Sequence, residues 1–226
     1  MTILYEDNHL LIVSKQPGEI TQGDKTGDTT LLDTAKAYIK EKYHKPGEVF
    51  LGLPHRLDRP TSGIVVLCRT SKALTRMSAL FREGKVSKTY HAIVPRIHTT
   101  DNQWHQLTHY LIRNEKQNKS YAYPTQRQGS KQAQLKYHII SHNDRYTLLE
   151  IQLLTGRHHQ IRSQLAAIGL TILGDLKYGA PRSNPDGSIC LHARTIAFTH
   201  PVTHQPINLT APYPTLPLWH TFEPFT

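Results

Sequence analysis

The sequence predicts an α+β fold, in which a mixed, mainly antiparallel β-sheet is flanked by a few helices. Short apolar or alternating segments, typical of strands, recur along the 226 residues. The few segments with helical spacing do not alternate regularly with these strands, which argues against a βαβ architecture. With 38% hydrophobic residues, the chain is long enough for one domain with a substantial core. We therefore expect residues 1–226 to form a single domain.

The first 84 residues contain strand and helix signals around one polar loop. Four short apolar runs predict strands: residues 3–5, 10–13, 50–53 and 64–68. Two segments carry apolar side chains at helical spacing: residues 29–42 and 70–83. Thr70 is the expected N-cap of the second helix and Gly84 its stop. The polar loop, residues 54–63, lies between two of the predicted strands.

The rest of the chain predicts mainly strands. These are residues 88–94, 135–140, 146–153, 188–198 and 206–211. One helix is expected over residues 159–168, closed by Gly169. Residues 113–131 are long, polar and basic, and we expect an exposed loop or flap there.

The charge balance concerns the partners of the protein. Lys plus Arg number 27 against 17 Asp plus Glu, a formal net charge of +10. Such a charge favours polyanionic partners, although a basic protein without a nucleic-acid role fits it equally.

The two cysteines, Cys68 and Cys190, are expected to be buried free thiols, as suits a reducing cytosol. Because the first residues lack the pattern of a signal peptide and no apolar run could span a membrane, we expect a cytoplasmic location.

The densest polar motif is HRLDRPTSG at residues 55–63. Arg56 and Arg59 flank one carboxylate, Asp58, and neighbouring cations favour its charged form. An ionised carboxylate on a rigid loop can attack an electrophilic carbon or stabilise a sugar cation. The alternative is that Asp58 makes surface ion pairs and caps a turn ahead of Pro60. From the residues alone, this structural role is favoured.

A second motif, TGRHHQIR at residues 155–162, joins a predicted strand to a predicted helix. Gly156 permits a sharp turn, and a helix N-terminus suits an anion. His159 and Arg162 are three residues apart, and His158 and Arg162 four, so each pair should share a helical face. This face could hold a phosphate or pair with Asp58. A helix start with polar surface side chains explains the motif equally well.

A third motif, KTYHAIV at residues 88–94, places Tyr90 on a predicted strand. An aromatic residue in such a position is usually core, but it can also stack on an unpaired base. Two short segments, GDLKYG at residues 174–179 and LHA at residues 191–193, carry little meaning alone.

Several other chemistries lack their residues. No HExxH-type or cysteine-rich ligand set accompanies His158 and His159, so we expect no metal site. A zinc deaminase needs H-x-E with P-C-x-x-C, which two isolated cysteines cannot supply. A glycosidase needs a second placed carboxylate, for which Asp175 is a poor candidate.

Taken together, these motifs resemble the RluA-like family of RNA pseudouridine synthases. HRLDRPTSG, followed at the family's spacing by TGRHHQIR, is a specific combination, and the match covers nearly the whole chain. The matching segments run in order: residues 3–7, 11–13, 55–63, 88–94, 155–162, 174–179 and 191–193.

The resemblance implies the pseudouridine synthase fold, with its sheet split by a central active-site cleft. It also implies an isomerase that converts uridine in structured RNA, tRNA or rRNA, to pseudouridine without any cofactor. On this resemblance Asp58 is the catalytic aspartate, Tyr90 packs on the target base, and Arg162 pairs with Asp58. RNA contacts are expected from basic side chains of the motifs and of the segment 113–131: Arg56, Arg59, Lys116, Lys119, Arg127, Arg157 and His159.

Members of this family often carry an N-terminal S4 RNA-binding domain. Because the catalytic pattern starts at residue 3, we expect none here, and the catalytic domain should bind RNA itself as a monomer. The alternative function is a non-catalytic RNA-binding or RNA-folding factor on the same fold. The intact Asp58, Tyr90 and Arg162 favour the enzyme. The sequence does not decide whether Asp58 attacks the ribose or helps to form a glycal-like intermediate.

Overall fold

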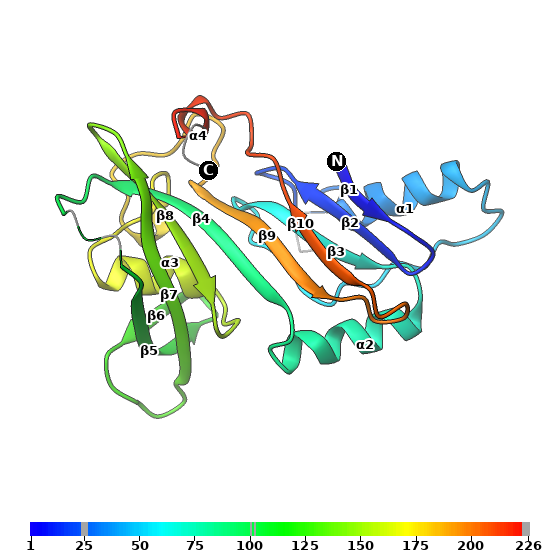
Figure 1. The fold of residues 1–226 in the computed structure, drawn as a ribbon, viewed down its shortest axis with the longest axis horizontal. Coiled ribbons are helices and arrows are strands. Elements are labelled where there is room, and N and C mark those ends of the chain that lie inside the picture. Colours follow the sequence, from blue (N-terminus) through cyan, green and yellow to red (C-terminus); the bar gives the residue numbers. More distant parts are fainter. Residues whose placement is uncertain (24–26, 100, 102, 223–226) are drawn as a thin grey trace. The chain divides into compact units, whose positions relative to one another are not determined.

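The computed structural model describes residues 1–23, 27–99, 101 and 103–222. The chain divides into two compact units (Figure 1). The first unit combines Met1–Ser87 with Ala193–Pro214, and the second combines Lys88–His192 with the chain from Thr215. Each unit is built on a β-sheet.

The sheet of the first unit brings strands from both ends of the chain together. Its strands, in sheet order, are β1 (Thr2–Glu6), β2 (Leu10–Lys15), β3 (Ser62–Cys68), β9 (Leu191–Thr199) and β10 (Pro206–Thr210). β2 is antiparallel to both β1 and β3, and β9 is antiparallel to β10. The strands expected at residues 3–5, 10–13, 64–68 and 206–211 are confirmed.

Both faces of this sheet are covered. Leu10 and Ile12 point to one face and Leu11 and Val13 to the other, and none of them is exposed. On the face of Leu10 and Ile12, α2 (Ser71–Arg82) packs with its buried side chains, including Met77. This core explains why an apolar run without alternation forms a strand here.

Both predicted helices of this unit are confirmed, as are the expected boundaries of α2. The hydroxyl of Thr70 accepts a 3.1 Å hydrogen bond from the Ala73 N–H at the start of α2. Gly84, with φ of +70°, follows its end. In α1 (Leu31–Lys42), Thr30 and Asp33 form a reciprocal capping box, so local chemistry sets this helix start.

The strand expected at residues 50–53 is wrong. Only Gly52 pairs there, in an isolated bridge with Cys68. Phe50 is half exposed, so the run does not have the continuous burial that its apolar letters suggested. A Cβ at Gly52 would lie 2.5 Å from the side chain of Leu74, so the chain passes close against α2 instead of extending into a strand.

The sheet of the second unit is antiparallel throughout its described pairs. Its order is β4 (Ser87–Pro95), β8 (Tyr146–Leu153), β7 (Lys131–His142), β5 (His105–Asn114) and β6 (Lys119–Tyr123). The strand order and the few helices confirm the α+β class with a mixed, mainly antiparallel sheet.

The loop or flap expected over residues 113–131 is wrong in part, because strand residues interrupt it, while residues 124–130 do lie outside any strand. β5 continues to Asn114, a turn follows, and β6 returns beside it. Ser120 is buried while Tyr121 is exposed. The strand therefore has one solvated face, and its many polar residues on that face hid the period of two.

One helix, α3 (Gln160–Ala167), packs against β5 and β6, as predicted from the third helical segment. The amide of Gln164 donates to the Ala133 carbonyl oxygen at 3.2 Å, which ties the helix to β7. The short elements η1 (Leu176–Tyr178) and α4 (Pro217–His220) were not predicted.

Two further features concern the environment of the chain. Cys68 and Cys190 are free and buried, as expected, and burial raises the pKa of each thiol to about 12. Among the described residues, no helix combines the length and the apolar character that crossing a membrane requires.

Candidate active site

The motif at residues 55–63 forms a loop that is held by its own first residues. His55 Nε2 accepts a 2.9 Å hydrogen bond from the Val66 N–H, and its ring stacks on Phe81 at 4.5 Å. Leu57 is buried, and its carbonyl oxygen accepts a 3.0 Å bond from the Thr21 hydroxyl. The residues that precede Asp58 are therefore fixed in place by these contacts.

A buried lysine lies beneath this turn. Lys15, the last residue of β2, is fully buried. Its Nζ donates to the carbonyl oxygens of Gln16, Arg59 and Thr61 at 2.9, 3.0 and 2.7 Å. Burial lowers the pKa of Lys15 to about 8, against the attraction of Glu19 and Asp58, which raises it. Lys15 thus uses all three ammonium hydrogens to hold the backbone around Asp58.

The turn itself runs from Asp58 to Thr61, whose N–H donates to the Asp58 carbonyl oxygen at 3.0 Å. Asp58 is half-buried and Arg56 exposed. The Arg59 guanidinium donates to the Gly18 carbonyl oxygen at 3.1 Å and lies 3.0 Å from the Asp28 carboxylate. These contacts let Arg59 support the loop, and because half of its side chain is exposed, RNA contact by Arg59 stays a prediction.

The glycine that ends the motif meets the LHA segment. Gly63 has a φ of +111°, and a Cβ there would overlap the backbone of Ala193. Two motifs 130 positions apart in the sequence therefore touch within the first unit, and only glycine permits the contact.

The second motif forms the start of α3 in the second unit. The sharp turn falls on His159, with φ of +51°, and not on Gly156 as predicted. Gln160 closes the turn: its side-chain oxygen accepts from the Arg157 N–H at 3.0 Å and from the Thr155 hydroxyl at 2.8 Å. These bonds help to hold the turn although its tightest residue, His159, is not a glycine.

Arg162 lies buried in a pair with Asp175, a carboxylate from the GDLKYG segment. Nε and Nη2 of Arg162 donate to Oδ2 and Oδ1 of Asp175 at 2.7 and 2.8 Å. Nη1 of Arg162 lies 3.1 Å from His159 Nε2, which confirms that His159 and Arg162 share one face. His158 precedes the helix and instead contacts Ser120 at 2.9 Å, so the face expected for His158 and Arg162 is wrong.

Tyr90 lies on β4, and 8% of its surface is exposed. In sheet register it pairs with Ile151 of β8, so its ring is on the same face as that buried side chain. This burial agrees with a core role, and stacking on a base stays a prediction.

The predicted RNA contacts occupy different settings. Lys116 and Arg127 are exposed beside the β5–β6 hairpin, and Lys119 is half-buried on β6. Arg127 lies over the Tyr123 ring at 3.8 Å. Arg157 is exposed, and its Nε donates to the Gln132 carbonyl oxygen at 3.1 Å. His159, by contrast, is buried, and both of its ring nitrogens have partners within the protein.

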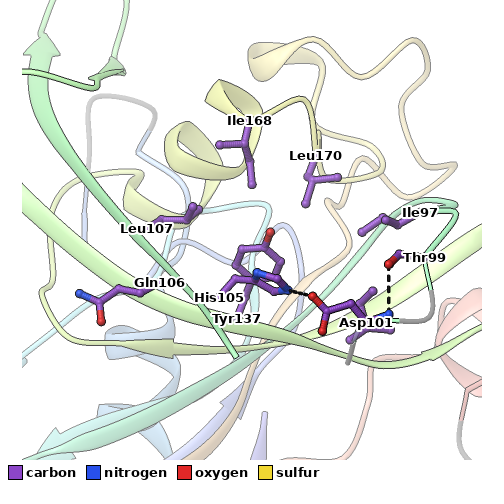
Figure 2. Close-up of a pocket in the computed structure, with 10 residues that line it drawn as sticks. Ile97, Thr99, Asp101, His105, Gln106, Leu107, Tyr137, Ile168 and Leu170 are labelled. Carbon is purple, nitrogen blue, oxygen red and sulfur yellow. Dashed lines mark hydrogen bonds and ion pairs between the residues drawn. The ribbon is translucent and has the colours of Figure 1, made fainter. Parts of the chain in front are cut away.

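A pocket of about 480 Å³ lies elsewhere in the second unit (Figure 2). His105 stacks on Tyr137 there and pairs with Asp101 at 3.2 Å, while Ile168 and Leu170 face them. None of the predicted site residues lines this pocket, so it is not the candidate active site. Within the described part of the chain, no cluster of His, Cys, Asp and Glu could hold a metal ion.

Sequence reasoning missed the residues that support the site: Lys15, His55, Gln160, Asp175 and Tyr178. A lysine at the end of an apolar strand was one available signal, since a charged side chain in a buried strand needs partners. The partners themselves are distant in the sequence and gave no local signal.

The comparisons with known proteins agree with this architecture. The structure of human RNA pseudouridylate synthase domain containing 4 superposes with a TM-score of 0.76 and 24% identity, over 98% of this chain and 92% of that one, so the two share a fold. The profile described as RNA pseudouridylate synthase matches residues 9–167. The chain belongs to this family.

Two relatives illustrate the range of the family. Ribosomal large subunit pseudouridine synthase C of Vibrio vulnificus is 32% identical over 216 residues, which cover 93% of this chain and 65% of that protein. Dual-specificity RNA pseudouridine synthase RluA of Haemophilus influenzae is 30% identical over 226 residues, which cover 93% and 92%. The chain thus spans about two thirds of the first relative and nearly all of the second.

Proposed function

We propose that this protein is an RNA pseudouridine synthase that isomerises specific uridines in structured RNA, either tRNA or rRNA. The observation that carries the proposal is the placement of Asp58 in a turn clamped by the buried Lys15. Membership of the family and the net charge of +10 support it.

In this reaction the bond between N1 of uracil and C1′ of the ribose breaks, the base rotates, and C5 bonds to C1′. The proton leaves C5 and N1 gains one, so the reaction needs no redox partner. Asp58 supplies the carboxylate at the sugar, Tyr90 packs on the uracil, and Arg162 is the third catalytic residue. The target nucleotide must leave its stack to reach such a site.

RNA is bound by the catalytic domain through Arg56, Arg59, Arg157 and the basic side chains of the β5–β6 hairpin. We propose a single catalytic domain that acts as a monomer in the cytoplasm. His159, whose ring nitrogens are engaged within the protein, supports Arg162 and does not itself contact RNA.

The test is Asp58→Asn, which keeps the size of the side chain and removes its charge. Tritium release from RNA carrying 5-tritiated uridine should fall at least about 10³-fold, while the RNA dissociation constant and the thermal midpoint stay near wild type. Asp28→Asn is the matched control, since Asp28 is a half-exposed carboxylate beside the same loop, and it should retain activity. Full turnover by well-folded Asp58→Asn would overturn the catalytic role of Asp58. RNA binding by wild type without any tritium release would favour the non-catalytic RNA-binding role.

A further inference from the structure

We infer that Asp175 is a positioning residue for Arg162, and that His159 and Tyr178 complete the frame that aims the guanidinium. The inference rests on the proposed function, in which Arg162 acts in the active site. It adds a role for the GDLKYG segment, whose residues touch neither substrate nor base in that proposal.

The carboxylate of Asp175 grips one edge of the guanidinium. Two parallel hydrogen bonds, 2.7 Å from Nε and 2.8 Å from Nη2, join the two groups. The side chains are 5% and 1% exposed. A bidentate pair of this kind fixes the plane of the guanidinium as well as its distance.

A third N–H group of Arg162 donates to His159. Arginine has only N–H donors, so His159 Nε2, at 3.1 Å from Nη1, must be the acceptor. The hydrogen of the neutral ring is then on Nδ1, which donates to the Tyr178 hydroxyl at 3.0 Å. Three of the five N–H donors of Arg162 are in these bonds, so the directions of the other two follow from the plane.

Tyr178 anchors this chain of bonds to the sheet. Its hydroxyl accepts from the Ser120 N–H at 2.8 Å and donates to the Ser120 carbonyl oxygen at 3.0 Å. With the bond from His159, the donor and both acceptor positions of the hydroxyl are used. The frame therefore runs without a gap from β6 to Arg162.

Asp175 is itself held by a rigid turn. Its carbonyl oxygen accepts from the N–H groups of Tyr178 and Ala180, each at 3.0 Å. Gly174 before it has a φ of +82°, and a Cβ there would lie 2.5 Å from the Ser188 carbonyl oxygen. Because this backbone is held in place, it cannot shift to compensate for a different side chain at position 175. A replacement of Asp175 should therefore change the position of the Arg162 guanidinium.

Stability alone does not explain such a pair. Apolar side chains of similar volume often stabilise a core as well as a buried ion pair does. An ion pair in which every donor has a defined partner does hold a charge in one orientation, and a displacement of about 1 Å can cost about 100-fold in rate.

The experiment measures single-turnover tritium release and RNA affinity for Asp175→Asn, Arg162→Lys and the double variant. Asp175→Asn should lower the rate at least about 10-fold with the RNA dissociation constant within about twofold of wild type. The double variant should be no slower than Arg162→Lys, because both changes remove the same arrangement. Glu150→Gln, which removes a carboxylate from β8 of the same unit, should keep the wild-type rate.

The Nε–H resonance of Arg162 gives a readout that does not depend on activity. In wild type it should be sharp and slow to exchange, and in Asp175→Asn it should broaden. A rate for Asp175→Asn within about twofold of wild type, or independent losses in the double variant, overturns the inference. If Asp175→Asn does not fold, Asp175→Glu retains the charge at a different length, and the same two thresholds apply to it. Absence of release by wild type on every RNA would refute the proposed function instead.

Discussion

The ammonium group of Lys15 donates a 2.7 Å hydrogen bond to the carbonyl oxygen of Thr61, at the end of the turn that Asp58 begins. Lys15 is fully buried, and two further carbonyl oxygens take its other hydrogens. Buried strands normally lack charged side chains. Here the buried charge of Lys15 gives hydrogen-bond partners to three carbonyl oxygens and so holds the loop around Asp58.

The first prediction concerns pH. With a pKa of about 8 for Lys15, the rate should fall as the pH rises from about 7.5 to 9.5, because a neutral amine has only two hydrogens to donate. The contribution of Lys15 to stability has the opposite sign. Since the ordinary pKa of lysine is 10.5, the unfolded chain holds the proton between pH 8 and 10.5 when the folded chain does not, so stability rises through that window.

Single-turnover rates and urea denaturation at matched pH values test this prediction. Lys15→Arg keeps its charge throughout, so the alkaline fall should disappear in this variant if it folds. An identical fall in Lys15→Arg would assign the titration to another group or to the RNA.

The second prediction concerns Tyr90. Tyr90→Phe keeps the ring and should retain most activity, whereas Tyr90→Leu should lose about 5- to 150-fold, the range that corresponds to base stacking of about 1–3 kcal/mol. Tyr137→Leu is the control. Tyr137 lies on β7 and pairs with Ile151 of β8, so β8 separates it from Tyr90 on β4, and it lines the separate pocket. Equal and complete loss in both Tyr90 variants would give the essential role to the hydroxyl.

The third prediction concerns the basic hairpin. Replacing Lys116, Lys119 and Arg127 by Gln should weaken RNA binding and make the slope of log K against log salt less steep by about 2. Filter binding from low to physiological salt measures this slope. Three exposed lysines of the first unit provide a control with the same charge change: Lys40, Lys45 and Lys72. Equal slopes for the two triple variants would show that binding follows net charge alone.

The fourth prediction concerns Gly63. Gly63→Ala should destabilise the protein by about 2–5 kcal/mol, because a positive φ and overlap with the Ala193 backbone act together. Gly84→Ala should cost only about 1–2 kcal/mol, since its φ of +70° is unfavourable but no atom lies within 4 Å of the added methyl group. Urea denaturation compares the two, and equal losses would contradict the packing argument.

Local chemistry explains what could be predicted of the fold. Helix α2 begins and ends where Thr70 and Gly84 predict, because capping and left-handed backbone depend on neighbouring residues. The prediction of a loop or flap over residues 113–131 missed strand β6 for the opposite reason. A strand with one solvated face takes its partner from elsewhere in the chain, and its polar side chains hide that pairing.

The sequence by itself determined the family and the identity of Asp58, Tyr90 and Arg162 as candidate residues, because motif order and spacing are properties of the chain. Only the tertiary structure decided what holds two of them. Lys15 reaches Thr61 across 46 positions, and Arg162 meets Asp175 across 13. Such contacts arise where strand pairing and turns bring distant backbone together around buried side chains, because a buried charge requires a specific partner.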